Sequence, residues 1–509
     1  MVVLPTPKEC FHYIKAGKRQ LYFFGSMSFI LLLTGMVMFT IAHPIAIVYV
    51  GFVLLTTSYL TVSYIVGIFG KEFSLREHNE LVAPFDLFFM SDKYKPSIDI
   101  YYPTCGEPEA MQVNSLNHII DLARDYGPLC KVYVLDDSPN YTGYNAYNKV
   151  KHRLGRSNIF CIMREDRGYL KKAGNLRNAF KQTTGEFIAI FDADFCPTPN
   201  FFQQTLPYML QDPTVGIVQT PQYFEVNKTK NWIENGAAYV QELFYRLIQV
   251  NRNSFGGSIC VGTNALYRRK CLEPFGGTAE IAYSEDVRTG FQVLSLGYKI
   301  KYIPIILAKG LCPNELPQFF LQQYRWAMGS ISLFFSKQFW QTKITKMQRV
   351  CYLGGMLYYI TTGLSLLFMN LPSVFMLMFA PSKILWFNFL FSFPSFVFGT
   401  FYQAYWSKHK WGLYAVKSRV VSYHSHLFAL VEYLTDNLTP WEPTAITKKT
   451  KVYVNFQQFL FWNTVFFSFI TIFLSGYNMA TNNPFNFLPT LALCLFNTYI
   501  SLSILRDQI

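Results

Sequence analysis

Four short polar motifs between residues 136 and 326 carry side chains that can do chemistry. In chain order they are Asp136-Asp137, Asp192-Ala193-Asp194, Ser284-Glu285-Asp286 and Gln322-Gln323-Tyr324-Arg325-Trp326. Acidic pairs suit a divalent metal ion and a nucleotide, because Mg²⁺ takes carboxylate and phosphate oxygens as ligands. A single carboxylate suits a general base. The set therefore indicates metal-dependent chemistry on a nucleotide-bearing substrate.

Asp192 and Asp194 are the predicted metal ligands. They directly follow the apolar run Phe187–Phe191, which we expect to form a buried strand. Two carboxylates at a strand end can reach a metal ion and the ribose or phosphates of a nucleotide together. An isolated Asp-X-Asp triplet also fits a solvated turn, but the preceding strand favours the metal site.

Asp286 is the predicted general base, and Glu285 is its local competitor. A hydroxyl group is a poor nucleophile, so a carboxylate must take its proton as the new bond forms. Alone, the Ser284-Glu285-Asp286 triplet would be an ordinary helix start with acidic residues at the positive end of the dipole. The other motifs are what favour a catalytic role.

Gln322, Arg325 and Trp326 are spaced so that all three share one helical face. Arg325 can stabilise a departing diphosphate, and Trp326 offers a flat apolar surface for a sugar ring. The alternative is an interfacial Trp beside an Arg whose head reaches the lipid headgroups. That alternative explains the residue types but not the presence of Gln322.

Three further loops are candidate binding segments for the nucleotide. Asp137 closes the expected strand Val132–Leu135, where it can accept hydrogen bonds from a base or ribose, or cap the following turn. The run Lys171-Lys172-Ala173-Gly174-Asn175 opens an expected helix. Backbone N–H groups and a Lys at such a position suit a diphosphate, although an exposed charged turn is the alternative. Residues 104–107 follow the first expected strand.

Residues 90–315 have the pattern of an α/β domain that positions these motifs. The expected strands are Ile98–Tyr102, Val132–Leu135, Ile159–Met163, Phe187–Phe191 and Val215–Gln219, with helical stretches at 108–125 and 173–184. Strands that alternate with helices predict a largely parallel sheet. Ligands bind beyond the carboxyl ends of such strands, and both acidic pairs fall there.

Apolar runs long enough to cross a bilayer flank this domain. They occupy residues 21–42, 44–69, 350–370 or 380, 384–405, 452–475 and 485–505. Charged residues are only 15% of the chain, against about 25% in an ordinary soluble domain. Basic residues precede the first run and fill the 406–451 segment, whereas 476–483 has no Lys or Arg. We therefore expect about six spans, with the catalytic domain and both termini cytoplasmic.

The chain thus divides into four expected regions. They are an N-terminal transmembrane hairpin at 1–70, a cytosolic catalytic domain at 71–315, an amphipathic interface helix at 316–345 and a C-terminal transmembrane region at 346–509 with a cytosolic 406–451 segment. The net charge of +14 fits basic cytoplasmic loops and a positive field that gathers anionic nucleotide-sugars. Nucleic-acid binding is disfavoured, because no Lys/Arg-rich patch with interleaved aromatic residues stands out.

The ordered motifs resemble those of the membrane-integrated processive family 2 glycosyltransferases, the group of the bacterial cellulose, hyaluronan and curdlan synthases. Further stretches match this family, namely Tyr102–Pro108, Gln219–Phe224, Val261–Asn264 and Ala445–Lys449. The last resembles the gating loop of cellulose synthases, although Thr444 replaces the aromatic residue that opens that loop.

The resemblance implies an α/β GT-A domain inserted in a helical transmembrane bundle. Asp192 and Asp194 would hold Mg²⁺ or Mn²⁺, and Asp286, Arg325, Trp326 and Gln322 would be the catalytic set. Nucleotide-sugar binding would involve Thr104, Glu107, Asp137, Lys171, Asp192 and Gln219. Gly262 and Thr263 would lie on the acceptor side, with Thr447 and Lys449 in the gating loop.

The implied activity is inverting, processive polymerisation of glucose from UDP-glucose into a β-linked capsular glucan that crosses the plasma membrane. The growing polysaccharide and the lipid bilayer are the expected partners, and the oligomeric state stays open. One alternative is a hyaluronan- or chitin-like synthase that uses UDP-N-acetylglucosamine, or a single-addition transferase that acts on a lipid carrier. Another alternative is a non-catalytic polysaccharide export channel.

Overall fold

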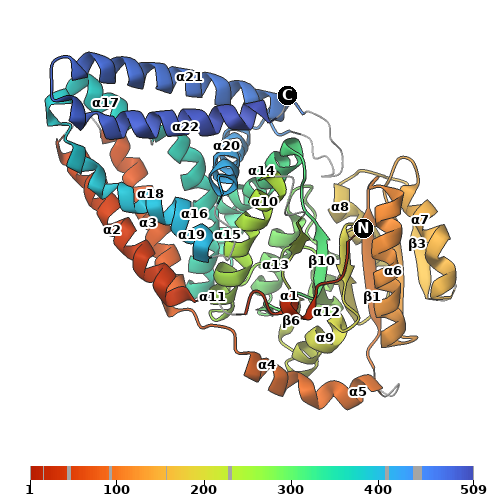
Figure 1. Cartoon of the computed structure of the whole chain (residues 1–509). Helices are drawn as coiled ribbons and strands as arrows, with labels where there is room; N and C mark the ends of the chain where they lie inside the picture. The colour runs from red at the N-terminus through yellow and green to blue at the C-terminus, as the bar shows by residue number, and fades with distance from the viewer. Residues whose placement is uncertain are drawn as a thin grey trace.

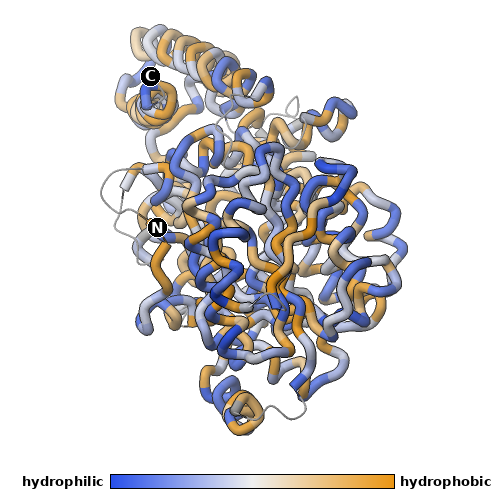
Figure 2. The backbone as a smooth tube through the Cα atoms, turned by 90° about the vertical axis from the view of Figure 1, so that its right-hand side faces the viewer, coloured by the Kyte–Doolittle hydropathy of each residue, from blue (hydrophilic) through white to orange (hydrophobic). Residues whose placement is uncertain are grey.

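The computed structural model describes residues 2–14, 17–42, 47–90, 95–155, 158–226, 232–368, 370–406, 412–439 and 450–507. A mixed sheet with helices on both faces forms one part of the molecule, and long apolar helices form the other (Figure 1). Figure 2 shows hydrophobic stretches that run through the middle of the sheet region, with hydrophilic segments around them. The fold thus separates an α/β domain from a helical bundle.

The main sheet has seven strands in the order β3-β2-β1-β4-β8-β6-β9. Their bounds are β1 Ile98–Thr104, β2 Cys130–Asp136, β3 Ile159–Ile162, β4 Phe187–Ile190, β6 Val215–Gln219, β8 Ala265–Arg268 and β9 Lys299–Tyr302. Only β8 runs antiparallel to its neighbours β4 and β6. All five strands expected from the sequence exist within two residues of their predicted bounds, and the prediction of a largely parallel sheet is confirmed.

A smaller sheet lies beside the main one, in the order β5-β10-β7. Its strands are β5 Phe195–Pro197, β7 Tyr223–Glu225 and β10 Ala308–Leu311. Because β5 begins at Phe195, the short connection from β4 consists of residues 191–194 and carries both predicted metal ligands. The two sheets therefore hold this acidic segment from both ends.

Helices cover both faces of the main sheet. They are α4 Leu75–Val82, α5 Asp86–Met90, α6 Glu109–Tyr126, α7 Thr142–Val150, α8 Lys171–Gln182, α9 Phe201–Gln211, α12 Arg269–Leu272 and α13 Glu285–Ser295. Successive side chains of β1 point to opposite faces of the sheet. Ile100 packs with α6 and α9, whereas Tyr101 packs with α8 and α13. The predicted helices at 108–125 and 173–184 correspond to α6 and α8.

Five helical runs in the described part of the chain are long and apolar enough to cross a membrane. They involve α2 Lys18–Ala42, α3 Ile47–Phe69, α16 Lys346–Phe368 continued by α17 Leu371–Phe379, α21 Lys451–Met479 and α22 Leu488–Arg506. Each corresponds to a span expected from the sequence, so five of those six expectations have a matching helix.

The expected span at 384–405 is corrected by the structure. This region contains a 3₁₀ helix at Trp386–Phe391, α18 Phe393–Val397, a π-helical turn at Phe398–Tyr402 and α19 Gln403–Trp406. Pro394 stands in the first turn of α18, where a proline starts a helix because its missing N–H is not needed there. Residues 393–406 thus form one continuous helix with a π-helical turn, which is shorter than the predicted span.

Four elements connect the α/β domain to the long helices. They are α10 Trp232–Leu243, α11 Gln249–Asn253, α14 Leu316–Phe334 and α20 Tyr414–Leu434, with a π-helical turn at Phe244–Ile248 between α10 and α11 and the short α15 Lys337–Gln341 after α14. The helix expected at 316–345 therefore ends early. Its apolar stripe is buried at Phe320, Tyr324, Met328 and Ile331, largely against α20 and α16. The short α1 Pro7–Cys10 packs on the α/β domain through Ile306.

Candidate active site

Asp192 stands at the end of β4 and contacts two other elements of the predicted site. Its backbone N–H donates to Thr263 Oγ1 at 2.9 Å. Lys172 Nζ on α8 donates to Asp192 Oδ1 at 2.5 Å and to the carbonyl oxygen of Gly262 at 3.0 Å. The acidic segment, the start of α8 and the loop Val261–Asn264 therefore meet at one point. The loop Val261–Asn264 is the predicted acceptor-side loop.

Lys172, rather than the predicted Lys171, is the lysine at this centre. Leu170 and Lys171 both have left-handed backbone angles, with φ of 49° and 50°, just where α8 begins. Lys172 Nζ also lies 3.9 Å from Glu285 Oε1. Burial works against its charge, but Asp192 and Glu285 raise the pKa of Lys172. Lys171 lies near Cys105, on the nucleotide side of the predicted site.

Asp194 is the second predicted metal ligand. Burial, together with the negative charge of Asp192, raises the pKa of Asp194 to about 8. A divalent cation between the two carboxylates would remove this cost. No group of three or more His, Cys, Asp or Glu residues that could hold a metal occurs in the described chain. Mg²⁺ takes a few carboxylates and completes its ligands with substrate phosphates and water, so this pair of carboxylates fits the ion by its chemistry.

Asp286 lies in the first turn of α13, against the acceptor-side loop. A Cβ atom on Gly262, whose φ is +76°, would lie only 2.7 Å from Asp286 Cβ. Burial and the neighbouring charge of Glu285 raise the pKa of Asp286 to about 7. A general base works best when its pKa is near the operating pH. Burial likewise raises the pKa of Glu285, which Lys172 counteracts.

The turn that carries Asp286 is fixed against α14. Ser284 has a left-handed backbone with φ of 47°, and its Oγ donates to the carbonyl oxygen of Arg325 at 3.1 Å. A Cβ on Gly329 would overlap Ser284 Cβ and Oγ, so only glycine lets the turn approach this closely. The predicted base and the Gln322–Trp326 motif therefore share one packed junction.

Arg325 belongs to the same charged cluster. Burial lowers the pKa of Arg325 to about 10, while Asp192 and Glu285 oppose that shift. One turn earlier, Gln322 Oε1 is buried and has no hydrogen-bond partner among the described residues. Trp326 follows Arg325 directly and is partly buried. This helix face thus offers a cation, an open amide oxygen and an indole ring.

Asp137 is held by Arg164, which the sequence did not reveal as part of the site. Arg164 Nε donates to Asp137 Oδ1 at 2.7 Å, and a second guanidinium nitrogen pairs with Oδ2. Arg164 also donates to the carbonyl oxygens of Tyr169 at 2.7 Å and Lys171 at 3.1 Å. The pair therefore ties the end of β2 to the start of α8. In the sequence, the only feature that could have singled out Arg164 is its position just after the strand β3.

The remaining predicted residues form hydrogen bonds within one loop or between two loops. Glu107 Oε2 accepts from Thr104 Oγ1 and from the Cys105 backbone N–H, both at 2.7 Å. Gln219 is fully buried, and its amide bonds to Thr263 O at 2.8 Å and to the Val261 N–H at 2.9 Å. Gln219 thus supports the acceptor-side loop. Thr447 and Lys449 lie outside the described residues.

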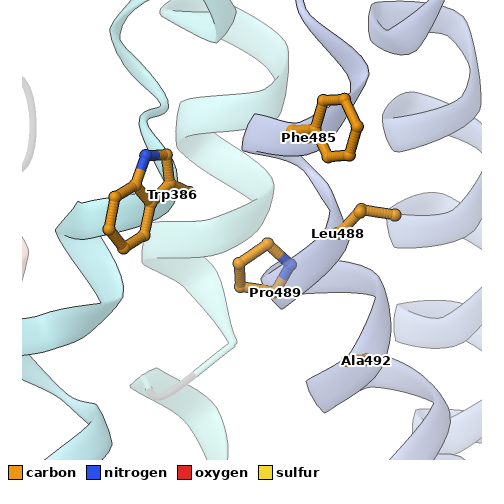
Figure 3. A pocket seen from close by; sticks show the side chains of 5 residues that line it. All are labelled: Trp386, Phe485, Leu488, Pro489 and Ala492. Atoms are coloured by element: carbon orange, nitrogen blue, oxygen red, sulfur yellow. The ribbon is translucent and has the colours of Figure 1, made fainter.

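An open surface hollow lies elsewhere, between the 3₁₀ helix Trp386–Phe391 and the start of α22 (Figure 3). Its lining residues are Trp386, Phe485, Leu488, Pro489 and Ala492. None of these side chains can act as an acid, a base or a metal ligand. The residues predicted to do chemistry lie instead at the junction of β4, α8, α13 and α14.

Comparisons with known proteins show what this chain is similar to. Residues 187–402 match the family described as "Glycosyl transferase family group 2". The mannosyltransferase PcManGT from Pyrobaculum calidifontis, solved in complex with GDP-Man and Mn²⁺, superposes with a TM-score of 0.51 at 15% identity, over 75% of this chain and 100% of that chain. The predicted GT-A fold is confirmed.

The chain is also similar in sequence to curated proteins, among them bacterial cellulose synthases. The chain is 31% identical over 287 residues to the UDP-forming cellulose synthase catalytic subunit of Pseudomonas fluorescens (strain SBW25), and the match covers 55% of this chain and 38% of that protein. It is 30% identical over 299 residues to the cellulose synthase 1 catalytic subunit of Komagataeibacter xylinus, with coverage of 58% and 39%. The match spans less than two fifths of the length of these relatives. The resemblance to processive family 2 glycosyltransferases is thereby confirmed.

Proposed function

We propose that this protein is a processive, inverting glycosyltransferase that polymerises glucose from UDP-glucose into a β-linked glucan. One observation carries the proposal: Asp286 lies against Gly262, while Lys172 joins that same loop to Asp192. A proton acceptor, an acidic pair and an acceptor-side loop thus meet at a single point. The relatives named as UDP-forming support a UDP-sugar as the donor.

The residues divide the reaction between them. The acceptor hydroxyl oxygen attacks the anomeric carbon of the donor sugar, and Asp286 takes the hydroxyl proton. The bond between that carbon and the diphosphate oxygen breaks, and UDP leaves with the bonding electrons. Arg325 and Lys172 stabilise the negative charge that develops on the leaving diphosphate. Attack from the side opposite the leaving group inverts the anomeric centre and gives a β linkage.

Asp192 and Asp194 would hold a divalent cation beside the diphosphate. When bound, Mg²⁺ or Mn²⁺ supplies positive charge to the phosphate oxygens of the leaving group. The chain's own contribution is to fix this position, because the Thr263 hydroxyl accepts from the Asp192 N–H and α8 places Lys172 next to it. Trp326 would stack on the acceptor sugar, and Thr104, Glu107, Asp137, Lys171 and Gln219 would bind or support the nucleotide-sugar site.

A line of polar aromatic residues supports translocation of the product through the helical bundle. Tyr359 lies on α16, one of the candidate membrane spans. Its ring centroid is 4.8 Å from that of His426 on α20, which also contacts Tyr358. Tyr59 on α3 follows, with its ring 6.0 Å from Tyr358. Such residues are costly inside a membrane bundle unless they serve a function.

The same proposal includes the cellular location of the protein and the role of the glucan. The protein would be a multi-pass plasma-membrane protein whose α/β domain and both termini are cytoplasmic, where UDP-sugars are available. The glucan would serve as a capsule. A hyaluronan- or chitin-like synthase that uses UDP-N-acetylglucosamine is the second candidate, because a few pocket hydrogen bonds decide between donors.

Donor-by-donor UDP release by the purified protein tests the proposal. With Mg²⁺ present, UDP-glucose should release UDP and yield a high-mass glucan, whereas UDP-N-acetylglucosamine should not. Linkage analysis of the product then gives the anomeric configuration, which we expect to be β. Release only from UDP-N-acetylglucosamine would establish the alternative donor. Absence of release from every UDP-sugar would point to a non-catalytic export channel.

A further inference from the structure

Arg252 is a buried cation that the proposed chemistry does not use. It lies on α11, and only 5% of its surface is exposed. Its Nη1 atom is buried and has no hydrogen-bond partner among the described residues. The ionisable groups near it are the thiol of Cys351 and the hydroxyls of Tyr352, Tyr359 and Tyr59, which are uncharged near neutral pH. No carboxylate is among them.

The structure makes specific room for this guanidinium. Gly354 and Gly355 on α16 face it, and a Cβ atom on Gly355 would lie 3.0 Å from Arg252 Nη2. A larger residue at position 355 would therefore press on the guanidinium. Two consecutive glycines also lower the intrinsic helix propensity of α16. The space for the guanidinium therefore destabilises that helix.

A second buried arginine shows how the chain treats a structural cation. Arg246, six residues earlier, is 1% exposed and forms an ion pair with Glu242. Another contact of its guanidinium is with His12 Nε2, at 2.7 Å. A buried charge without such a partner destabilises a fold, whereas a paired one is tolerated. Arg252 therefore calls for a ligand that brings hydrogen-bond acceptors of its own.

Arg252 lies where the chain that leads to the proposed acceptor loop packs on the long helix α16. Gly355, which faces the Arg252 guanidinium, lies one helical turn before Tyr359 on α16. The Arg252 carbonyl oxygen accepts hydrogen bonds from the N–H groups of Phe255 and Gly257. The chain then runs directly into the loop that contains Gly262. A sugar that has just left the acceptor position would meet this residue next.

We propose that Arg252 binds the growing saccharide, donating hydrogen bonds to hydroxyl oxygens of the sugar units that have just passed the acceptor position. A guanidinium has five donors and no acceptor, so it suits a ligand rich in hydroxyl oxygens. The rings of Tyr59 and Tyr359 offer apolar faces for the same sugars. This inference rests on the proposed polymerase function, and the ligand is a neutral β-linked hexose chain.

The test compares Arg252→Met with Arg246→Met in the purified full-length protein. Before any donor is added, Arg252→Met should keep or raise the Tm, because an unpaired buried charge has been removed. Arg246→Met should lower the Tm, because Glu242 then loses its buried partner. With UDP-glucose and Mg²⁺, Arg252→Met should make glucan about tenfold shorter, since lost charge-assisted hydrogen bonds speed chain release.

Arg252→Lys keeps the charge and should restore part of the product length. Product of wild-type length from Arg252→Met would overturn the inference. A fall in Tm as large as that of Arg246→Met would also overturn it, because it would assign Arg252 a structural role. These results are distinct from failure of the proposed function, in which the wild-type protein itself releases no UDP.

Discussion

Lys172 Nζ lies 2.5 Å from Asp192 Oδ1, and this contact joins the two halves of the candidate site. On one side is the acidic segment between β4 and β5. On the other is the turn of Glu285, whose carboxylate is 3.9 Å from the same ammonium group. One lysine therefore balances the charges of the metal-binding segment and of the segment that carries the base.

Replacing Lys172 with Met should shift the pH dependence of the reaction. The positive charge of Lys172 lowers the pKa of Asp286, so its removal should raise that pKa further above about 7. Less Asp286 is then ionised at a given pH, and the acidic limb of the profile of kcat against pH should move to higher pH. Lys181→Met, an exposed lysine on the same helix, is the matched control. An unchanged pH profile in the Lys172 variant would show that Lys172 does not control the pKa of Asp286.

Gly262→Ala should abolish most activity. The added Cβ would lie 2.7 Å from Asp286 Cβ, and the backbone φ of +76° is unfavourable for alanine. The acceptor-side loop would have to move away from the base, and a displacement of about 1 Å can cost about a hundredfold in rate. Gly476→Ala is the control, because nothing lies within 4 Å of the place that its Cβ would occupy. Equal UDP release by the two variants would contradict the close approach.

The Asp137–Arg164 pair should matter for stability as well as for donor binding. Both side chains are almost fully buried, so Arg164→Met leaves an uncompensated carboxylate and should cost about 3–5 kcal/mol of unfolding free energy. KM for the donor should rise, because the start of α8 loses its anchor. Arg76→Met breaks an exposed pair with Glu80 and should cost less than about 1 kcal/mol. Chemical denaturation compares the two, and equal losses would argue against the buried pair.

Much of this architecture was accessible from the sequence, for identifiable reasons. The strands β1, β2, β3, β4 and β6 are apolar runs bounded by polar turns, so their bounds were predicted closely. The positions of Asp192 and Asp194 followed from the end of β4. The choice between Lys171 and Lys172 did not, because two left-handed residues at the start of α8 decide which lysine enters the site. Such local backbone geometry leaves no mark on hydrophobic periodicity.

Two other features depended on contacts distant in the chain. Arg164 meets Asp137 only because β2 and β3 are neighbours in the sheet. The 384–405 segment has the composition of a span, yet it forms a 3₁₀ helix followed by a helix of residues 393–406 that contains a π-helical turn.

The most direct test of the central claim is the rate of UDP release by Asp286→Asn with Glu285→Gln as its partner variant. With the wild-type protein, the rate should increase as the pH rises through about 7, because Asp286 accepts the proton only when ionised. In Asp286→Asn the rate of UDP release should fall by about 10²–10⁴-fold and should no longer depend on pH in this range. In Glu285→Gln the pH dependence should remain. Wild-type turnover by Asp286→Asn, or loss of the pH dependence in Glu285→Gln alone, would contradict the assignment of the base.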